Sequence, residues 1–278
     1  MLRFKLVFID KSNMNREELM RKLIFKGGKI ILKNFQYVQN SWEKTKDDYV
    51  TNVDLEIEKK ITEEIKRRFP EDGILAEEGE TKEGKSKYKW IIDPLDGTNN
   101  YVRGIPQAGI QIALEKNGET YSGIIYNPFA KEIYTAKKGQ HAYKEFLDGS
   151  RKRIKVSDRN LKNSLMVFEG GLKKDESGLK KSIFDEMLKE VGHVRIYGVA
   201  VQDLPYVACG RAEILISLIP KPMDIAAGIL LIKEAGGKVT TIDGKPANQY
   251  SKNFIASNRI VHDSVLEIVK NVRKEKNL

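Results

Sequence analysis

The sequence predicts a protein of mixed α and β structure in two halves: helices packed on an antiparallel sheet, followed by an α/β half. Two helical patterns begin the chain, and three strand-like runs separated by Asn117-Gly118 and Lys138-Gly139 then indicate antiparallel hairpins. Beyond these runs, strand and helix patterns alternate, which is typical of α/β folds. The polar connector over residues 157–163 predicts one domain of residues 1–156 and a second of residues 157–278.

The helices are predicted from apolar residues at helical spacing and from the residues that begin or end such runs. Asn15 is a suitable N-cap for the first helix, and Pro70 ends the second. We expect Gly27-Gly28 to weaken the middle of the first helix and Pro205 to kink or shift the helix that contains it. The predicted helices are residues 16–35, 51–69, 178–191, 199–209, 224–235 and 263–272.

The strands are predicted from short apolar or alternating runs that end at turn residues. Polar stretches at Gln39–Asp48 and Thr81–Lys87 are predicted to be loops. The N-terminal run is predicted as a strand because no signal-peptide pattern accompanies it, and the role of the leader over residues 1–14 is open. The predicted strands are residues 2–9, 74–76, 88–92, 110–114, 121–126, 132–136, 141–146, 153–156, 165–168, 194–197, 213–219, 238–242 and 254–257.

Composition excludes several classes of protein. A single cysteine, Cys209, excludes an intramolecular disulfide framework, and no apolar run approaches the ~18 residues that a membrane span needs, so we expect a cytoplasmic protein. The net charge is +10, but the 49 basic residues are mixed with 39 acidic ones and form no block of five. This pattern favours a solvated surface over a nucleic-acid or membrane interface, and a basic rim would attract phosphate esters.

The segment Trp90–Asn100, WIIDPLDGTNN, carries the strongest chemical signal. A buried strand is predicted to end at Asp93, and Asp96 follows three residues later. Gly97 and Thr98 then offer backbone N–H groups and a hydroxyl that can hold a phosphate. Paired carboxylates beside a phosphate cradle indicate Mg²⁺, although two solvated surface turns would give the same pattern.

The run D-P-L-D-G-T-N-N resembles the signature of the inositol monophosphatase family, which comprises Mg²⁺-dependent, lithium-sensitive phosphatases of small phosphorylated polyols, sugars and nucleotides. Asp54, Glu77-Glu78 and Met223–Gly228 match further family motifs in order, with Met223 in place of the usual tryptophan. The resemblance covers roughly Arg16–Val272. It implies a layered α-β-α-β-α fold and a homodimer.

The resemblance also implies a set of metal ligands. One Mg²⁺ would take Glu77, Asp93 and the backbone carbonyl of Leu95, a second would take Asp93, Asp96 and Asp224, and a third, weaker one would use Glu77. Four converging carboxylates are stable only with cations, and oxygen ligands select Mg²⁺ or Mn²⁺ over zinc. For Asp224, which begins a predicted helix, a simple N-cap is the alternative.

The catalytic pair implied by the resemblance is Asp54 and Thr98, which would orient and deprotonate the attacking water, with no covalent phospho-enzyme. Asp54 also stands at the start of a predicted helix, so it is equally a capping residue. Gly97 and Thr98 N–H groups would hold the phosphate of the substrate beside Asp96. Lys44 and Lys46, in a loop that is mobile in the family, are further possible neighbours of the site.

The substrate is less well defined. Inositol-binding members carry a glutamate where this chain has Ile216–Leu218, without an acid. Arg195, Ala200 and Arg211 match the substrate contacts of archaeal-type members that hydrolyse both fructose 1,6-bisphosphate and inositol phosphates, although each arginine could simply be exposed. An adenosine 3′,5′-bisphosphate phosphatase is the alternative within the family. The alternative of another class is a catalytically silent, basic nucleic-acid-binding protein.

Overall fold

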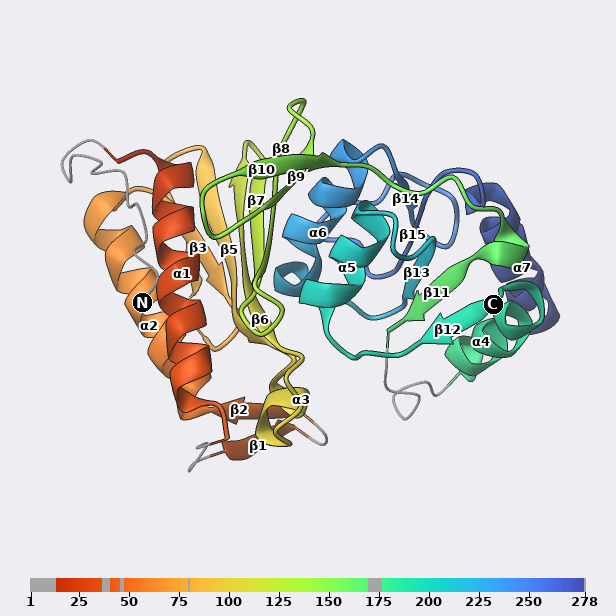
Figure 1. Cartoon of the computed structure of the whole chain (residues 1–278), viewed down its shortest axis with the longest axis horizontal. Coiled ribbons are helices and arrows are strands. Elements are labelled where there is room, and N and C mark those ends of the chain that lie inside the picture. Colours follow the sequence, from red (N-terminus) through yellow and green to blue (C-terminus); the bar gives the residue numbers. More distant parts are fainter. Residues whose placement is uncertain (1–13, 37–40, 46–47, 80, 170–176, 278) are drawn as a thin grey trace.

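The computed structural model describes residues 14–36, 41–45, 48–79, 81–169 and 177–277. The strand expected at residues 2–9 and Lys46 lie outside these residues. The elements form five layers in the order helices, sheet, helices, sheet, helices (Figure 1). The layered α-β-α-β-α fold expected from the sequence is therefore confirmed.

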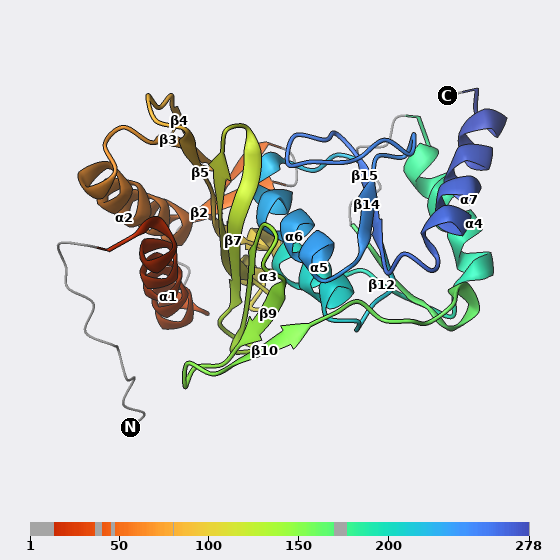
Figure 2. The same ribbon diagram turned by 90° about the horizontal axis from the view of Figure 1, so that it is seen from above.

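The outer helical layer on one side consists of α1 and α2, which cover one face of the first sheet (Figure 2). Helix α1 begins where expected, because the Asn15 side chain accepts a hydrogen bond from the N–H of Glu18, and the Glu18 carboxylate accepts one from the N–H of Asn15. Gly28 has a packing role: a Cβ atom there would lie 2.3 Å from the Tyr126 ring. The glycine pair thus lets α1 approach the sheet closely, a benefit that helix propensity alone does not reveal. The helices are α1 (Arg16–Asn34), α2 (Asn52–Arg68), α3 (Thr98–Val102), α4 (Leu179–Glu190), α5 (Ala200–Ala208), α6 (Pro222–Glu234) and α7 (His262–Glu275).

The first sheet has eight strands in the order β10-β9-β8-β7-β6-β5-β3-β4. All neighbours are antiparallel except β3 and β5, which run parallel, so the side chains that follow these two strands leave the same edge. The strands are β3 (Gly73–Ala76), β4 (Thr81–Lys82), β5 (Tyr88–Asp96), β6 (Gly109–Lys116), β7 (Glu119–Asn127), β8 (Glu132–Lys137), β9 (Ala142–Glu145) and β10 (Arg151–Ile154).

Two loop predictions and one predicted strand end in this half were wrong. The predicted loop Gln39–Asp48 contains β1 (Ser41–Thr45), which pairs with β2 (Asp48–Thr51) as a hairpin. Strand β4 lies in the predicted loop Thr81–Lys87 and pairs with β3. Strand β5 was expected to end before Asp93, yet it continues to Asp96 because a bulge accommodates Pro94, as described below.

The second sheet has five strands in the order β12-β11-β13-β15-β14. Strand β11 runs parallel to both β12 and β13, whereas β15 runs antiparallel to β13 and β14. Helices α4 and α7 cover its outer face (Figure 1). Helix α5 continues through Pro205. The strands are β11 (Leu165–Phe168), β12 (His193–Arg195), β13 (Ile214–Ser217), β14 (Lys238–Thr240) and β15 (Phe254–Ser257).

Helices α5 and α6 form the middle layer between the two sheets (Figures 1 and 2). One apolar core joins this layer to both sheets, since it contains Ile125 of β7, Leu204 of α5, Ile229 of α6 and Leu215 of β13. Helix α6 is buried on nearly all sides, and burial of each large apolar side chain contributes about 1.5–3 kcal/mol. The start of α6 is therefore fixed against the first sheet. No helix of the described residues is long and apolar enough to cross a membrane.

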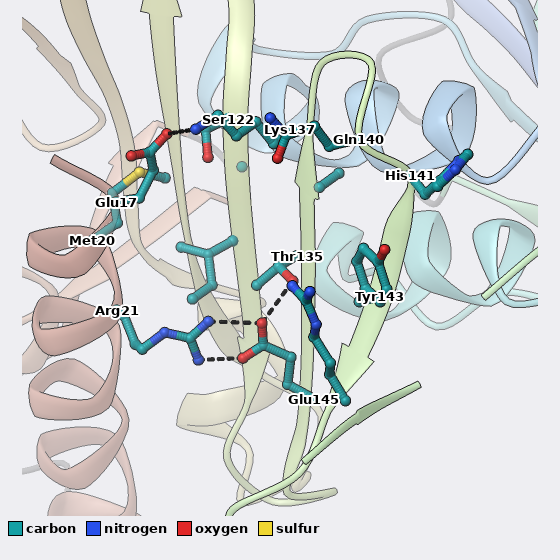
Figure 3. Close-up of a pocket in the computed structure, with 14 residues that line it drawn as sticks. Glu17, Met20, Arg21, Ser122, Thr135, Lys137, Gln140, His141, Tyr143 and Glu145 are labelled. Atoms are coloured by element: carbon teal, nitrogen blue, oxygen red, sulfur yellow. Dashed lines mark hydrogen bonds and ion pairs between the residues drawn. The ribbon is translucent and has the colours of Figure 1, made fainter. Parts of the chain in front are cut away.

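A cavity of about 360 Å³ lies between α1 and the strands β7 to β9. Within it, the Arg21 guanidinium of α1 makes two hydrogen bonds to the Glu145 carboxylate of β9, which also accepts a hydrogen bond of 2.8 Å from the Thr135 hydroxyl (Figure 3). Glu145 is 5% exposed, whereas Arg21 is half-exposed. The Glu145 carboxylate is thus buried with its charge matched by a residue of α1.

We predict that Arg21→Met lowers the free energy of unfolding by about 1–3 kcal/mol, because it leaves the buried Glu145 carboxylate without its charged partner. Urea unfolding measures this change. Lys181→Met, which breaks an exposed ion pair on α4 with Asp185, is the matched control and should change stability by less than about 0.5 kcal/mol. Equal effects of the two substitutions would contradict this assignment.

Candidate metal centre and active site

The bulge in β5 determines where its two aspartates lie. Asp93 pairs with Gln111 of β6, and Asp96 pairs with Gly109. Between these two pairs β5 advances by three residues and β6 by two, so β5 contains one extra residue. The extra residue turns the strand locally, and Pro94 is tolerated there because a bulged residue needs no ladder hydrogen bond. Asp93 is 1% exposed, and its Oδ1 accepts a 3.1 Å hydrogen bond from the N–H of Leu95.

Two further carboxylates meet Asp93 from distant parts of the chain. Glu77 follows β3, whose last residue Ala76 pairs with Ile92, so the parallel strands deliver Glu77 and Asp93 to one sheet edge. Asp224 comes from the first turn of α6. Glu77, Asp93 and Asp224 each offer a carboxylate oxygen, and these three atoms lie within 4.8 Å of one another. The structure therefore brings these three predicted ligands together.

Helix α6 is tied down at the point where it presents Asp224. The Gln111 side-chain amide donates a 2.9 Å hydrogen bond to the Asp224 carbonyl, which links α6 to β6. The Asp224 Oδ2 accepts a 3.2 Å hydrogen bond from the N–H of Lys221. The N-cap of α6 is Lys221, so the prediction that Asp224 is a simple N-cap was wrong. Asp224 is the third residue of the helix, where its carboxylate accepts the N–H of the N-cap residue and also belongs to the acidic cluster.

Burial and mutual repulsion make the cluster electrostatically costly. Burial, followed by the charges of Glu77 and Asp96, raises the pKa of Asp93 and of Asp224 well above the ordinary range. Burial likewise raises the pKa of Asp96 to about 7. Such a cluster is suited to a hard divalent cation, because every donor is an oxygen and the buried Gln111 Oε1 beside it has no hydrogen-bond partner.

Lys221 is a charged neighbour that sequence analysis missed. Its Nζ lies 2.9 Å from Glu77 Oε1, and its charge opposes the rise of the Asp224 pKa. The available signal was its position three residues before Asp224, where the structure has the N-cap of α6. Because the Lys221 ammonium group and a metal ion would both bind Glu77, the two cations compete for the same carboxylate.

Asp54 and Thr98 form a hydrogen-bonded pair next to this centre. The Thr98 hydroxyl lies 3.1 Å from Asp54 Oδ1 and 2.9 Å from the Leu95 carbonyl, so its single proton can be donated to either. The other Asp54 oxygen accepts hydrogen bonds from the N–H and hydroxyl of Thr51 at the start of α2. Asp54 is fully buried, which raises its pKa to about 6. The same carboxylate therefore caps α2 and contacts Thr98.

Gly97 connects β5 to α3 and lies against the start of α5. Its φ of +83° is in the left-handed region that favours glycine, and a Cβ atom there would come within 2.8 Å of the Gln107 carbonyl. The Asp96 Oδ2 accepts a hydrogen bond from the N–H of Val201 in α5. Ala200, the first residue of α5, consequently lies next to the acidic centre, as the predicted substrate contact requires.

The two predicted arginine contacts behave differently. Arg195 ends β12, is exposed, and donates a 2.8 Å hydrogen bond to the Val194 carbonyl, with no carboxylate partner among the described residues. Arg211 lies beyond the opposite end of α5 from Ala200, where its guanidinium binds both oxygens of Glu132 at 2.6 and 2.8 Å. This ion pair joins the segment between α5 and β13 to β8 and engages the charge of Arg211, so the predicted substrate contact of Arg211 stays a prediction.

Arg211 lines a surface groove of about 740 Å³. The sequence analysis did not predict that basic residues gather there. Half of the basic side chains that line it are paired with Glu132 or Glu213. The groove lies at the end of α5 that faces away from Asp96, so it takes no part in the acidic centre. Its basic residues are Lys144, Lys152, Arg153, Lys155, Arg159 and Arg211.

Comparison with known proteins gives consistent matches over almost the whole chain. The model of the inositol monophosphatase family matches residues 14–274. A fructose-1,6-bisphosphatase/inositol-1-monophosphatase of Thermotoga maritima is 38% identical over 263 residues, which cover 94% of this chain and 98% of that protein. A Nus factor SuhB of Xylella fastidiosa is 36% identical over 233 residues, 82% of each chain. The solved structure of a Thermotoga maritima IMPase superposes with a TM-score of 0.85 at 35% identity, covering 95% of this chain and 100% of that one.

We predict that Asp93→Asn weakens Mg²⁺ binding at least about tenfold, equivalent to about 1.4 kcal/mol, because it removes a buried carboxylate at the middle of the cluster. Titration calorimetry measures this loss. In a chelator the variant should be as stable as the unaltered protein or more so, because the fold disfavours the charged form of Asp93. Asp185→Asn on exposed α4 is the control, and unchanged Mg²⁺ affinity in Asp93→Asn would contradict the assignment of the centre.

Proposed function

The chain belongs to the inositol monophosphatase family, and on that premise we propose that it is a Mg²⁺-dependent hydrolase of small phosphate monoesters, inositol 1-phosphate and/or fructose 1,6-bisphosphate. Membership makes the chain a phosphoric monoester hydrolase; the substrate and the metal activation are the proposal. The observation that carries it is the convergence of Glu77, Asp93 and Asp224 next to the pair formed by Asp54 and Thr98.

The metal-binding residues in this proposal are Glu77, Asp93, Asp96 and Asp224, together with the Leu95 carbonyl. Bound Mg²⁺, or Mn²⁺ as a substitute, would supply Lewis-acid activation of water and neutralise the charge on the phosphate and the leaving oxygen. Two or three ions per site are proposed from the resemblance. Lys221 would have to yield or share Glu77 when the ions bind.

The proton acceptor in this proposal is Asp54, acting through Thr98. When the Thr98 hydroxyl donates to Asp54, its oxygen is left with lone pairs that can accept a hydrogen bond from the attacking water. The water proton then passes to Thr98 as the Thr98 proton passes to Asp54. Asp54 suits this task because its pKa of about 6 keeps it ionised at neutral pH and still basic.

The phosphate is proposed to bind at the N–H groups of Gly97 and Thr98, beside Asp96. Gly97 supports this assignment because its backbone conformation and its contact with α5 leave no room for a side chain. Ala200 and Arg195 would then lie toward the rest of the substrate, at the start of α5 and at the end of β12. Arg211 has no part in this binding mode, because its guanidinium is paired with Glu132.

Other substrates and roles are less well supported. Adenosine 3′,5′-bisphosphate needs a partner for its second phosphate, and Arg195 is the one predicted arginine whose guanidinium has no carboxylate partner among the described residues. The converging carboxylates argue against a catalytically silent nucleic-acid-binding protein, because they repel the phosphate backbone of a nucleic acid unless cations are bound. A cytoplasmic location and a homodimer remain part of the proposal, drawn from the sequence and the family.

We predict that the purified protein releases phosphate from inositol 1-phosphate or fructose 1,6-bisphosphate in Mg²⁺ and loses this activity in excess chelator. A phosphate-release assay over these two substrates and adenosine 3′,5′-bisphosphate makes the measurement. The nucleotide should be a poorer substrate than inositol 1-phosphate, because among the described residues Arg195 is the one predicted contact arginine whose guanidinium has no carboxylate partner and could bind a second phosphate. Activity that persists in the chelator would refute the metal-dependent mechanism, and a preference for the nucleotide would refute the substrate assignment.

We also predict a fall in kcat/KM below pH 6, about tenfold per pH unit, because burial raises the pKa of Asp54 to about 6 and only its charged form accepts a proton. The pH profile is measured at saturating Mg²⁺. Asp54→Asn should reduce kcat at least about hundredfold at pH 7.5. A profile that is flat between pH 5 and 7 would contradict the role of Asp54.

A further inference from the structure

Three buried side-chain oxygens near the second sheet have no hydrogen-bond partner within the part of the chain that the structure describes. They are Oε2 of Glu169, which follows β11, Oγ of Ser217, which ends β13, and Oδ1 of Asp203 in α5. A buried acceptor without a donor costs about 1–3 kcal/mol. A structure tolerates such atoms mostly where a ligand or an ordered water supplies the missing donor.

These three side chains face the same space. Val167 and Leu215 pack in the core under α5 and α6, whereas Phe168 and Ile216 pack with α4 and α7. Side chains alternate between the faces of a sheet, and the N–H of Glu169 continues the ladder by donating to the Ile216 carbonyl at 3.3 Å. Glu169 and Ser217 therefore point toward the middle layer, which contains Asp203.

This space adjoins the acidic centre. The charge of Asp96, followed by that of Glu169, adds to burial in raising the pKa of Asp203 well above its ordinary range. Glu169 also contributes to the raised pKa of Asp224, and burial raises its own pKa to about 6, opposed by the charge of Lys180. Because Glu169 follows β11 on the face of the second sheet that packs against the middle layer, its carboxylate lies on the second-sheet side of the centre, and its charge acts on Asp96, Asp203 and Asp224.

The chemistry of this space favours a donor that carries no charge. A cation is not indicated, because among the described residues Glu77, Asp93 and Asp224 are the group whose carboxylate oxygens lie close enough to hold one ion, and Glu169 and Asp203 are outside it. A second phosphate at this position would be repelled by the Glu169 carboxylate, which is charged at neutral pH. Hydroxyl groups, in contrast, donate hydrogen bonds to carboxylates without adding charge.

We propose that Glu169 determines substrate specificity by accepting hydrogen bonds from hydroxyl groups of a polyol or sugar whose phosphate lies at the Asp93 centre. This inference rests on the proposed function. Glu169 is partly exposed and is the one of the three that a ligand can reach, whereas Asp203 and Ser217 are 2% exposed. The carboxylates next to Asp96 thus select a hydroxylated substrate body and disfavour a second phosphate at that position.

The test compares a polyhydroxylated substrate with one that has no hydroxyl groups. Glu169→Leu should lower kcat/KM for inositol 1-phosphate about tenfold or more, mainly through KM, because hydrogen bonds to a charged acceptor are lost. The loss for p-nitrophenyl phosphate should be at least fivefold smaller. Glu169→Gln, which keeps one acceptor oxygen, should recover part of the lost activity toward inositol 1-phosphate.

Controls separate this inference from the function on which it rests. Mg²⁺ affinity of Glu169→Leu, measured by calorimetry, should fall far less than that of Asp93→Asn, because Glu169 is outside the ligand set. Glu190→Leu at the exposed end of α4 should leave kcat/KM for both substrates unchanged. Equal losses for both substrates, or no loss for either, would overturn the role of Glu169. If the unaltered protein hydrolyses neither substrate with Mg²⁺, the proposed function itself fails.

Discussion

The repulsion between Glu77, Asp93 and Asp224 is the constraint on which the rest of the structure depends. Their oxygens lie within 4.8 Å of one another, and burial prevents water from screening their charges fully. Such an arrangement persists only because the packing around it is stronger than the repulsion. Two parallel strands fix Glu77 and Asp93 at one edge, and the largely buried helix α6 holds Asp224 against them.

Helix starts provide much of this positioning. Asp54 and Asp224 each use one carboxylate oxygen to accept a hydrogen bond from the first turn of a helix, and each has a second oxygen available to the centre or to Thr98. The N–H of Val201 does the same for Asp96 from the start of α5. Capping and chemistry are thus two uses of the same carboxylates, which explains why local sequence alone supported both interpretations.

The sequence predicted the features that depend on neighbouring residues. Alternation and turn residues identified most strands and helices, and the motif at Asp93 and Asp96 indicated an acidic centre. What it could not predict depends on partners distant in the chain. The course of β5 through Pro94 follows from its pairing with β6, and the ion pair of Arg211 joins residues 79 positions apart in the chain. Lys221 and Glu169 lack a motif, so only the fold reveals that they adjoin the centre.

Diffraction from crystals grown with Mn²⁺ tests the central claim most directly, since anomalous scattering locates the ions without assumption. The account predicts at least one strong anomalous peak bound by oxygens of Glu77, Asp93 and Asp224, with the Lys221 ammonium group displaced from Glu77. A second peak between Asp93, Asp96 and Asp224 would extend the agreement to the full ligand set. Peaks confined to other parts of the surface, with Lys221 still on Glu77, would contradict it.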